Sequence, residues 1–261
     1  MKIEDVIKKH LPYPFGVCDF EYLRDRLLPC RAAERLPKLP RAVICFTVPY
    51  NVREQSPENI SRYAAVPDYH SVLEEVFSPL LSALKAAFPK NEFAFFTDNS
   101  PIPEVRAAAA AGLGTVGKHG LLITEKYGSF VFLAEIVTDL PLKAEIKTAF
   151  CEDCGLCAAA CPVGLNKEEC LSAVTQKKQP LTQSEEEKIL SLGSVWGCDI
   201  CQSVCPKNKG AALSDLPLFV SGYRDRYTIG EDIKGRAYAW RGEKVIRRNA
   251  ELIKCRECHH D

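Results

Sequence analysis

Seven of this chain's thirteen cysteines fall in two short runs, and these runs restrict the fold more than any other feature. The run that begins at Cys151 follows the spacing C-x2-C-x2-C-x3-C-P, and the run that begins at Cys198 follows C-x2-C-x3-C-P. In the first spacing, three thiolates of one turn bind a single 4Fe–4S cluster and the fourth cysteine reaches a neighbouring cluster. The second run lacks the leading cysteine, and Cys170 is the nearest spare thiol. The eight predicted ligands of two clusters are Cys151, Cys154, Cys157, Cys161, Cys170, Cys198, Cys201 and Cys205.

Other uses of clustered cysteines fit this spacing less well. Zinc sites use paired C-x2-C knuckles, and a third cysteine at the next step followed by Cys-Pro is not typical of them. Structural disulfides are typical of small secreted domains, whereas this sequence opens without a charged and then apolar leader. Zinc or redox-active thiols remain the alternatives. The two-cluster interpretation predicts a protein that transfers electrons in a reducing cytoplasm.

Composition limits the remaining possibilities. The chain has 261 residues with 46% apolar content, enough for a substantial core in two domains. No apolar run is long enough to span a membrane, and a formal net charge of zero gives no global attraction to nucleic acid. Residues 222–256 differ, with ten Arg or Lys against five Asp or Glu. We expect a helix at 236–248 whose basic face meets either solvent or a phosphate backbone, through Arg241, Lys244, Arg247 and Arg248.

The first 150 residues show the pattern of an α/β domain. A continuous apolar, β-branched run at 41–50 predicts a buried strand, and apolar residues at helical spacing predict a helix at 69–88. Pro103 and Gly112 are typical of the start and stop of a further helix. Three more strands are expected at 92–97, 121–124 and 129–137. The predicted fold is α/β (α+β), with an α/β domain at 1–148, a ferredoxin-like two-cluster domain at 149–212 and a helical extension at 213–261.

Asp98 is the best candidate for chemistry outside the cysteines. It follows an aromatic strand at a turn fixed by prolines. If Phe93, Phe95 and Phe96 desolvate its carboxyl, the pKa of that group is raised and it holds a proton near neutrality. The simpler interpretation is ordinary turn chemistry, because Asp is favoured in turns.

Two further motifs fall short of known signatures. The glycine-rich stretch 112–118 lacks the spacing of a phosphate-binding loop and closes a helix instead of opening one. It fits either close approach to a flat cofactor or a plain turn. The stretch 68–73 approaches the D-x-H-x-x-G signature of cobalamin proteins but has no glycine, so we assign no axial histidine.

The cysteines outside the two runs receive no cluster role. Cys255, Cys258 and His259 have metal-like spacing but no partner ligands, so we leave metal binding there open. The other three are expected to be packing thiols: Cys18, Cys30 and Cys45.

Several short motifs also occur in a fixed order between residues 40 and 250. They are Arg62-Tyr63-Ala64, Asp68-Tyr69-His70, Thr97-Asp98, Ala111-Gly112-Leu113-Gly114, Gly117-Lys118, Tyr127-Gly128-Ser129, Leu133-Ala134-Glu135, and the segments around Cys151, Cys170 and Cys198. Together they resemble the epoxyqueuosine reductase family, cobalamin-dependent iron–sulfur enzymes of tRNA queuosine synthesis. The ordered set is far more specific than any single motif.

The resemblance implies a concrete set of cofactors and ligands. Cobalamin would bind base-off in the first domain, at segments around Ser61, Leu122 and Leu133, and Asp98 matches the family's proton donor at that cofactor. Of the two 4Fe–4S clusters, one would use Cys151, Cys154, Cys157 and Cys205, and the other Cys161, Cys170, Cys198 and Cys201.

The resemblance also implies an activity. A low-potential donor of the ferredoxin or flavodoxin type would reduce the clusters, which pass electrons to cobalamin for reduction of epoxyqueuosine to queuosine in tRNA, while Asp98 protonates the departing oxygen. We expect a monomer with no membrane contact. The sequence ends about where the family's helical-repeat tail begins, which weakens the expectation of tRNA binding. The alternatives are a cobalamin and iron–sulfur reductase of another small substrate, as in reductive dehalogenases, and a ferredoxin-type electron carrier.

Overall fold

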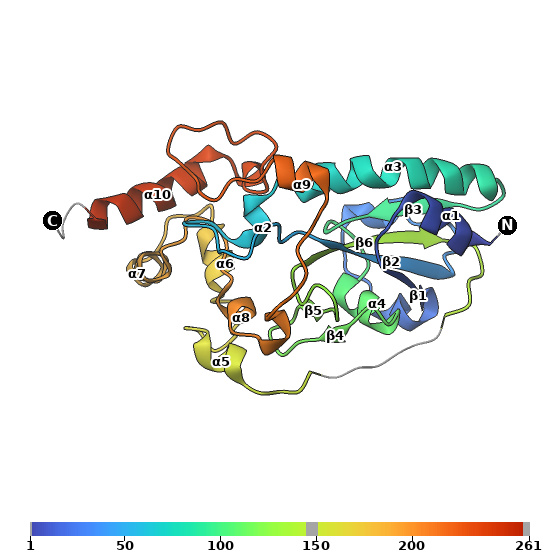
Figure 1. The fold of residues 1–261 in the computed structure, drawn as a ribbon, viewed down its shortest axis with the longest axis horizontal. Helices are drawn as coiled ribbons and strands as arrows, with labels where there is room; N and C mark the ends of the chain where they lie inside the picture. The colour runs from blue at the N-terminus through green and yellow to red at the C-terminus, as the bar shows by residue number, and fades with distance from the viewer. Residues whose placement is uncertain (1, 145–150, 258–261) are drawn as a thin grey trace. The chain divides into compact units, whose positions relative to one another are not determined.

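The computed structural model describes residues 2–144 and 151–257 and divides into two compact units (Figure 1). The sheet unit comprises Met1–Pro49 and His70–Asp153, and the cysteine unit comprises Tyr50–Tyr69 and Cys154–Asp261. The fold is mixed α/β, as the sequence predicts. No helix within the two described ranges combines the length and the apolar character that crossing a bilayer requires.

A four-stranded antiparallel sheet forms the centre of the sheet unit, with strand order β1-β2-β6-β3 (Figure 1). All eight residues of β2 are buried, and so are all but the first of β6, as their apolar runs predict. Three of these strands confirm the predictions at 41–50, 92–97 and 129–137, whereas the short β1 was not predicted. The strands are β1 (Phe15–Asp19), β2 (Ala42–Pro49), β3 (Phe93–Phe96) and β6 (Val131–Thr138).

Helices cover both faces of this sheet. On one face, α3 (Tyr69–Ala87) packs Phe77 against Phe46 of β2 and Phe95 of β3. On the other face, α4 (Glu104–Ala110) contacts β1, β2 and β6. Because side chains alternate along a strand, neighbouring residues of β2 face the two different helices. Both helices confirm the predicted segments at 69–88 and 103–112.

The alanines of α4 let its backbone approach the sheet closely. A Cβ added to Gly16 of β1 would overlap the carbonyl oxygen of Ala111. Gly112 then adopts a φ of 79°, which ends the helix as expected. The smaller elements of this unit are α1 (Ile3–His10), the 3₁₀ helices η1 (Phe20–Arg26) and η2 (Arg31–Arg35), and the hairpin of β4 (Thr115–Val116) and β5 (Leu122–Ile123).

The cysteine unit is built from short helices around an aromatic core. Trp196 and Tyr238 are fully buried and their rings meet edge to face at 6.1 Å. The helix α10 contacts α6 and α7. The helices are α2 (Arg62–Ala65), α5 (Leu156–Ala160), α6 (Leu171–Thr175), α7 (Gln183–Leu192), α8 (Ile200–Ser203), η3 (Pro206–Asn208), α9 (Pro217–Ser221), η4 (Ala239–Arg241) and α10 (Glu243–Glu257).

This division differs from the predicted boundaries in two respects. Residues 50–69 pack with the cysteine unit, because Ile60 forms a β-bridge with Trp196 and the Ser61 N–H donates to the Trp196 carbonyl at 2.8 Å. The segment 213–261 also belongs to this unit and supplies Tyr238 to its core. Both contacts join residues far apart in the sequence, and local patterns do not report such pairs.

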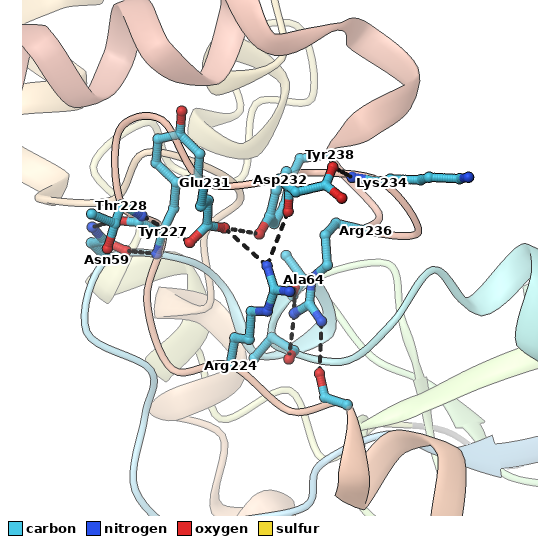
Figure 2. A network of polar contacts seen from close by, with 12 residues as sticks. Asn59, Ala64, Arg224, Tyr227, Thr228, Glu231, Asp232, Lys234, Arg236 and Tyr238 are labelled. Atoms are coloured by element: carbon cyan, nitrogen blue, oxygen red, sulfur yellow. Dashed lines mark hydrogen bonds and ion pairs between the residues drawn. The ribbon is translucent and has the colours of Figure 1, made fainter.

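The predicted helix at 236–248 is wrong in its first half. Gly242, with a φ of 83°, separates η4 from α10, so regular helix begins only at Glu243. Arg236 lies before this break and is 3% exposed. Its guanidinium donates to the carbonyl oxygens of Ala64, Ala65 and Gly222 (Figure 2).

Figure 2 shows that the residues around Arg236 also make polar contacts with one another. Arg224 donates to the Asp232 carbonyl at 3.1 Å, and Tyr238 donates its hydroxyl to Glu231 at 2.9 Å. The basic residues nearer the C-terminus are also engaged within the chain, since Arg247 pairs with Glu251 and Arg248 binds the Gln179 carbonyl. This part of the basic segment therefore stabilises the unit internally.

Candidate functional site

Four of the eight predicted cluster ligands lie together in the cysteine unit. The thiols of Cys198 and Cys201 interact electrostatically with those of Cys161 and Cys170. Burial, followed by these neighbouring thiols, raises the pKa of Cys201 to about 12, and burial also raises the pKa of Cys198. The protein brings four thiols into one partly buried place, and a bound metal must displace their protons.

The two cysteine runs repeat one local geometry. Cys161 follows α5 with φ −74° and ψ 121°, and Cys205 precedes η3 with φ −71° and ψ 121°. A proline comes next in both cases, and proline restricts the preceding residue to extended backbone. The helices α5 and α8, which carry Cys157 and Cys201, pack against each other. The matching backbone is expected of two cluster-binding loops that exchange their fourth cysteine.

The cysteines predicted to hold the other cluster are divided between the two units. Cys157 is buried on α5 and Cys154 is exposed, both in the cysteine unit, whereas Cys151 belongs to the end of the sheet unit. The adjoining Asp153 has a φ of 49° and pairs with Lys118 at 2.7 Å. Lys118, from the glycine-rich stretch, therefore contacts the cysteine run through this carboxylate.

The donor set suits a cluster better than a single ion. Among the described residues, no three Cys, His, Asp or Glu side chains converge as a single metal ion requires. A cubane spreads its ligand sulfurs more widely than one ion does, and its ligands are thiolates. The described cysteines are free of disulfides. The free thiols present therefore fit the thiolate ligation of a 4Fe–4S cluster.

Asp98 lies in a turn after β3 with a φ of 55°, a left-handed conformation that few residues other than glycine adopt. Its Oδ2 lies 3.2 Å from Nε2 of His70, near the start of α3. The Asp98 side chain is 59% exposed and that of His70 is 41% exposed. The turn therefore presents a carboxyl and an imidazole at the surface of the sheet unit.

The expected desolvation of Asp98 by aromatic residues is wrong. The Asp98 side chain is 59% exposed, so the aromatic residues of β3, Phe93, Phe95 and Phe96, do not desolvate its carboxyl. A strand alternates its side chains between faces and places them over the sheet, not over the turn that follows. The desolvated carboxyls of this unit are Glu104 and Glu135 instead.

Glu135 is the most deeply buried acid of the described chain. It lies in β6 opposite Cys45 of β2 and Phe96 of β3, is 0% exposed, and has no hydrogen-bond partner among the described residues. Burial first, then the charges of Glu104 and Asp98, raise the pKa of Glu135 well above its ordinary value. The sequence held a signal for this residue, a single acid inside an otherwise apolar strand.

Glu104 begins α4 and connects this buried acid to Asp98. Its carboxyl accepts a hydrogen bond from the backbone N–H of Asp98, and its buried Oε2 has no hydrogen-bond partner in the part of the chain that the structure describes. Burial and the nearby Asp98 charge raise the pKa of Glu104 to about 7. Sequence reasoning missed Glu104 because an acid in the first turn of a helix is ordinary.

The predicted corrin-lining residues fall in different units. Leu122 and Leu133 belong to one apolar cluster of the sheet unit, at 2% and 8% exposure, and the Leu133 carbonyl accepts from Thr97 next to Asp98. Ser61 belongs to the cysteine unit, where its hydroxyl is buried beside Gly197 and has no hydrogen-bond partner among the described residues. Leu133 is therefore hydrogen-bonded to the neighbour of Asp98 in the sheet unit, whereas Ser61 belongs to the other unit.

The structure describes all or part of three further motifs from the sequence analysis. Cys18 and Cys45 are buried thiols, as expected, and Cys30 is half-buried. The glycine-rich stretch forms a tight turn, because a Cβ on Gly114 would overlap the Ile123 carbonyl. Cys255 is exposed, whereas Cys258 and His259 lie outside the described residues.

Comparisons with known proteins agree with these features. Residues 30–99 match the family described as "Epoxyqueuosine reductase QueG, DUF1730", and residues 150–208 match the "4Fe-4S double cluster binding domain". An epoxyqueuosine reductase of Lactococcus garvieae is 35% identical over 225 residues, which cover 74% of this chain and 64% of that protein.

Solved structures give the same result. An epoxyqueuosine reductase with an epoxyqueuosine-modified tRNA-Tyr stem loop has a TM-score of 0.80 at 25% identity, over 96% of this chain and 79% of that one. A Bacillus subtilis structure with its catalytic aspartate loop swung out of the active site has the same TM-score, identity and coverage.

The described chain carries both parts of that architecture, the α/β sheet unit and the double-cluster cysteine segment. It spans about two thirds or less of the length of the curated relatives that it matches, 64% for the Lactococcus protein. The two family matches, the related sequences and the shared fold show that the chain is similar to epoxyqueuosine reductases in both of its parts.

Proposed function

We propose that this protein is an oxidoreductase that reduces the epoxide of epoxyqueuosine in tRNA to the alkene of queuosine. The observation that carries the proposal is the gathering of Cys161, Cys170, Cys198 and Cys201 within a chain similar to epoxyqueuosine reductases. The related structure with an epoxyqueuosine-modified tRNA stem loop supports the substrate.

The cysteines supply the route for electrons. Cys161, Cys170, Cys198 and Cys201 would hold one 4Fe–4S cluster, and the remaining four ligands would hold the other: Cys151, Cys154, Cys157 and Cys205. Partial burial of the first set keeps the cluster from open solvent, where exposed clusters are degraded more easily. The external electron donor would be a low-potential carrier of the ferredoxin or flavodoxin type.

Cobalamin is the second cofactor of the proposal. When bound it supplies a strongly reducing, nucleophilic cobalt centre. Leu122 and Leu133 of the sheet unit are apolar, which suits contact with a corrin ring. These residues bind and orient the cofactor.

Asp98 has the chemistry of the proton donor. Its carboxyl is exposed in the sheet unit, so an arriving substrate can cover it, and His70 lies within hydrogen-bond distance to fix its orientation. Residue 98 also has a left-handed backbone conformation, and such strained positions cluster at functional sites. The Bacillus subtilis relative also has a catalytic aspartate loop, which supports this role.

The test is an anaerobic assay of the purified protein on tRNA that carries epoxyqueuosine, with queuosine measured by mass spectrometry of the nucleosides. We expect about eight irons per chain, a corrin absorbance after reconstitution with cobalamin, and formation of queuosine. Iron without turnover on tRNA, but with turnover of a free epoxide, would favour a small-molecule reductase. Iron alone with no reduction of any epoxide would leave an electron carrier.

Asp98→Asn tests the acid role inside that assay. The variant keeps the shape of the side chain but has no acidic proton, so we expect turnover to fall at least about a hundredfold with iron content unchanged. Cys201→Ser should lose iron, whereas Cys255→Ser, which changes an exposed cysteine outside the ligand set, should not. Full turnover by the Asp98→Asn protein would remove the proton-donor assignment.

A further inference from the structure

Glu135 has no structural reason to be an acid. It occupies the central position of a buried strand, between Cys45 and Phe96, and both of its carboxyl oxygens lack hydrogen-bond partners among the described residues. An apolar residue of similar size would stabilise such a position, because burying an unpaired polar group is unfavourable. A buried acid that gains nothing from its surroundings is a candidate for proton chemistry.

Glu135 belongs to a row of acids that reaches the surface at Asp98. Glu135 interacts electrostatically with Glu104, and both interact with Asp98. Glu104 is further tied to that turn by accepting the Asp98 backbone N–H. The row therefore runs from the middle of β6 to the start of α4 and then to the exposed turn after β3.

The surroundings determine which of these groups carries a proton at neutral pH. Cys45 of β2 faces the pair with Cys18 of β1 nearby, and burial keeps both thiols neutral by raising their pKa. A positive charge on His70 of α3 lowers the pKa of Glu104, but by less than burial and Asp98 raise it. Burial keeps Glu135 in its protonated form, and Glu104 gains or loses its proton near pH 7.

The proposed reaction needs more protons than Asp98 holds. Two electrons from the external low-potential donor and two protons convert the epoxide to an alkene: both carbon–oxygen bonds break, a carbon–carbon double bond forms, and the oxygen leaves as water. Asp98 has one proton to give. A bound substrate also covers its exposed carboxyl, which hinders direct reprotonation from bulk water.

We propose that Glu104 and Glu135 form a buried proton store behind Asp98 that resupplies it during turnover. The inference rests on the proposed function for its substrate. Glu104 transfers its proton to Asp98 and recovers one from Glu135 or, after product release, from solvent. Both residues act through Asp98 and do not touch the substrate.

The first measurement does not depend on activity. Infrared titration of the wild-type protein should show two protonated carboxyls at neutral pH, one that titrates near pH 7 and one that does not titrate there. Glu104→Gln should remove the first signal and Glu135→Gln the second. Asp98→Asn should shift the Glu104 transition to lower pH, because it removes the negative charge that raises the pKa of Glu104. Absence of protonated carboxyls at pH 7 would overturn the proposal whatever the protein's substrate.

The second measurement is the pH profile of kcat on epoxyqueuosine tRNA. As the pH rises through about 7, Glu104 loses its proton, so wild-type turnover should fall on the alkaline side. Glu104→Gln and Glu135→Gln cannot pass a proton, and we expect kcat to fall roughly tenfold or more, with this alkaline limb lost in Glu104→Gln. The control is Glu75→Gln, on the exposed face of α3, with the wild-type profile.

Failure of the proton-store proposal can be distinguished from failure of the proposed function. Wild-type kcat and pH profile in both glutamine variants, with the infrared signals present, would show that the acids are buried but unused and would overturn the proposal. Absence of epoxide reduction by the wild-type protein would instead overturn the proposed function. The proton store of Glu104 and Glu135 would then have no reaction to supply. A merely structural role for the acids predicts changed stability with an unchanged pH profile.

Discussion

In the cysteine unit, single residues allow segments that are distant in sequence to pack closely. Gly197 is the clearest case, since it lies next to the predicted ligand Cys198 and has a φ of 76°. A Cβ at this position would overlap the Oγ of Ser61, and Ser61 is itself fixed by the Trp196 carbonyl. The absence of a side chain at residue 197 therefore lets the segment 50–69 reach the second cysteine run.

Gly197→Ala should destabilise the protein through both backbone strain and this overlap. Gly210→Ala is the matched control, because Gly210 has a φ of 74° and no atom within 4 Å of an added Cβ. We expect about 1 kcal/mol for Gly210→Ala from the backbone alone, and about 1–3 kcal/mol more for Gly197→Ala from overpacking. Thermal unfolding of the iron-loaded proteins measures the difference.

A second substitution separates the two causes. Ser61→Gly removes both the Cβ and the Oγ that the new methyl group would meet. The double variant Gly197→Ala, Ser61→Gly should therefore unfold at a temperature closer to that of Gly210→Ala. Equal unfolding temperatures for the two single variants would contradict the contact between Gly197 and Ser61.

At the scale of elements, the short helix α6 connects several parts of the cysteine unit. Its last residue, Thr175, accepts the Gly197 N–H through Oγ1 at 2.9 Å, and its carbonyl accepts from Asn249 of α10 at 2.8 Å. Asn249 is fully buried and also donates to the Val195 carbonyl at 2.9 Å. Because Cys170 directly precedes α6, these bonds connect α10 to two of the predicted ligand segments.

Asn249→Ala should loosen that connection. Two buried carbonyls lose their donor, and we expect a loss of about 2–4 kcal/mol in unfolding free energy together with a lower iron content. The control Glu251→Ala removes an exposed ion pair with Arg247 on the same helix and should change stability by less than about 0.5 kcal/mol. Chemical denaturation and iron analysis check both, and wild-type values for Asn249→Ala would contradict the role of α10.

Elements with a strong local pattern were predictable from the sequence. The apolar run of β2, the helical spacing of α3 and the Pro-to-Gly limits of α4 each appear in a single stretch of residues. The placement of residues 50–69 could not be predicted, because it depends on the pairing of Ile60 with Trp196, which is distant in sequence. The helix predicted across Gly242 failed because the left-handed backbone there ends regular hydrogen bonding.

The candidate site was predictable to a different degree in its two parts. The cysteine spacing carries its own chemistry, so the eight ligand cysteines could be predicted before their positions were known, and the family resemblance then implied the group of Cys161, Cys170, Cys198 and Cys201. The acid row could not be grouped, because Glu104 and Glu135 are distant in sequence and meet only through the packing of α4 on the sheet. Burial of a carboxyl is a property of the folded chain, and the sequence marks it only as an acid within an apolar strand.

For the whole molecule, the two units are stabilised by different means. The sheet unit has a continuous ladder of backbone hydrogen bonds across four strands and its own apolar core. In the cysteine unit, the helices that carry predicted ligands are four and five residues long, as in α8 and α5. Helices of this length are unstable alone, so a bound cluster should supply much of their stability.

Removal of iron should therefore affect the two units unequally. With the ligands proposed above, chelation under reducing conditions would convert the thiolates to thiols, and the partly buried Cys198 and Cys201 would lose their bonds to iron. We expect faster hydrogen–deuterium exchange in peptides from 151–205, little change in peptides from β2 and β6, and recovery on reconstitution with iron and sulfide. Peptides around Tyr238 serve as the internal control, because this buried residue of the aromatic core lies outside the segment 151–205. Equal loss of protection in β2 and in α8 would show that the sheet depends on the clusters, contrary to the separate cores seen in the two units.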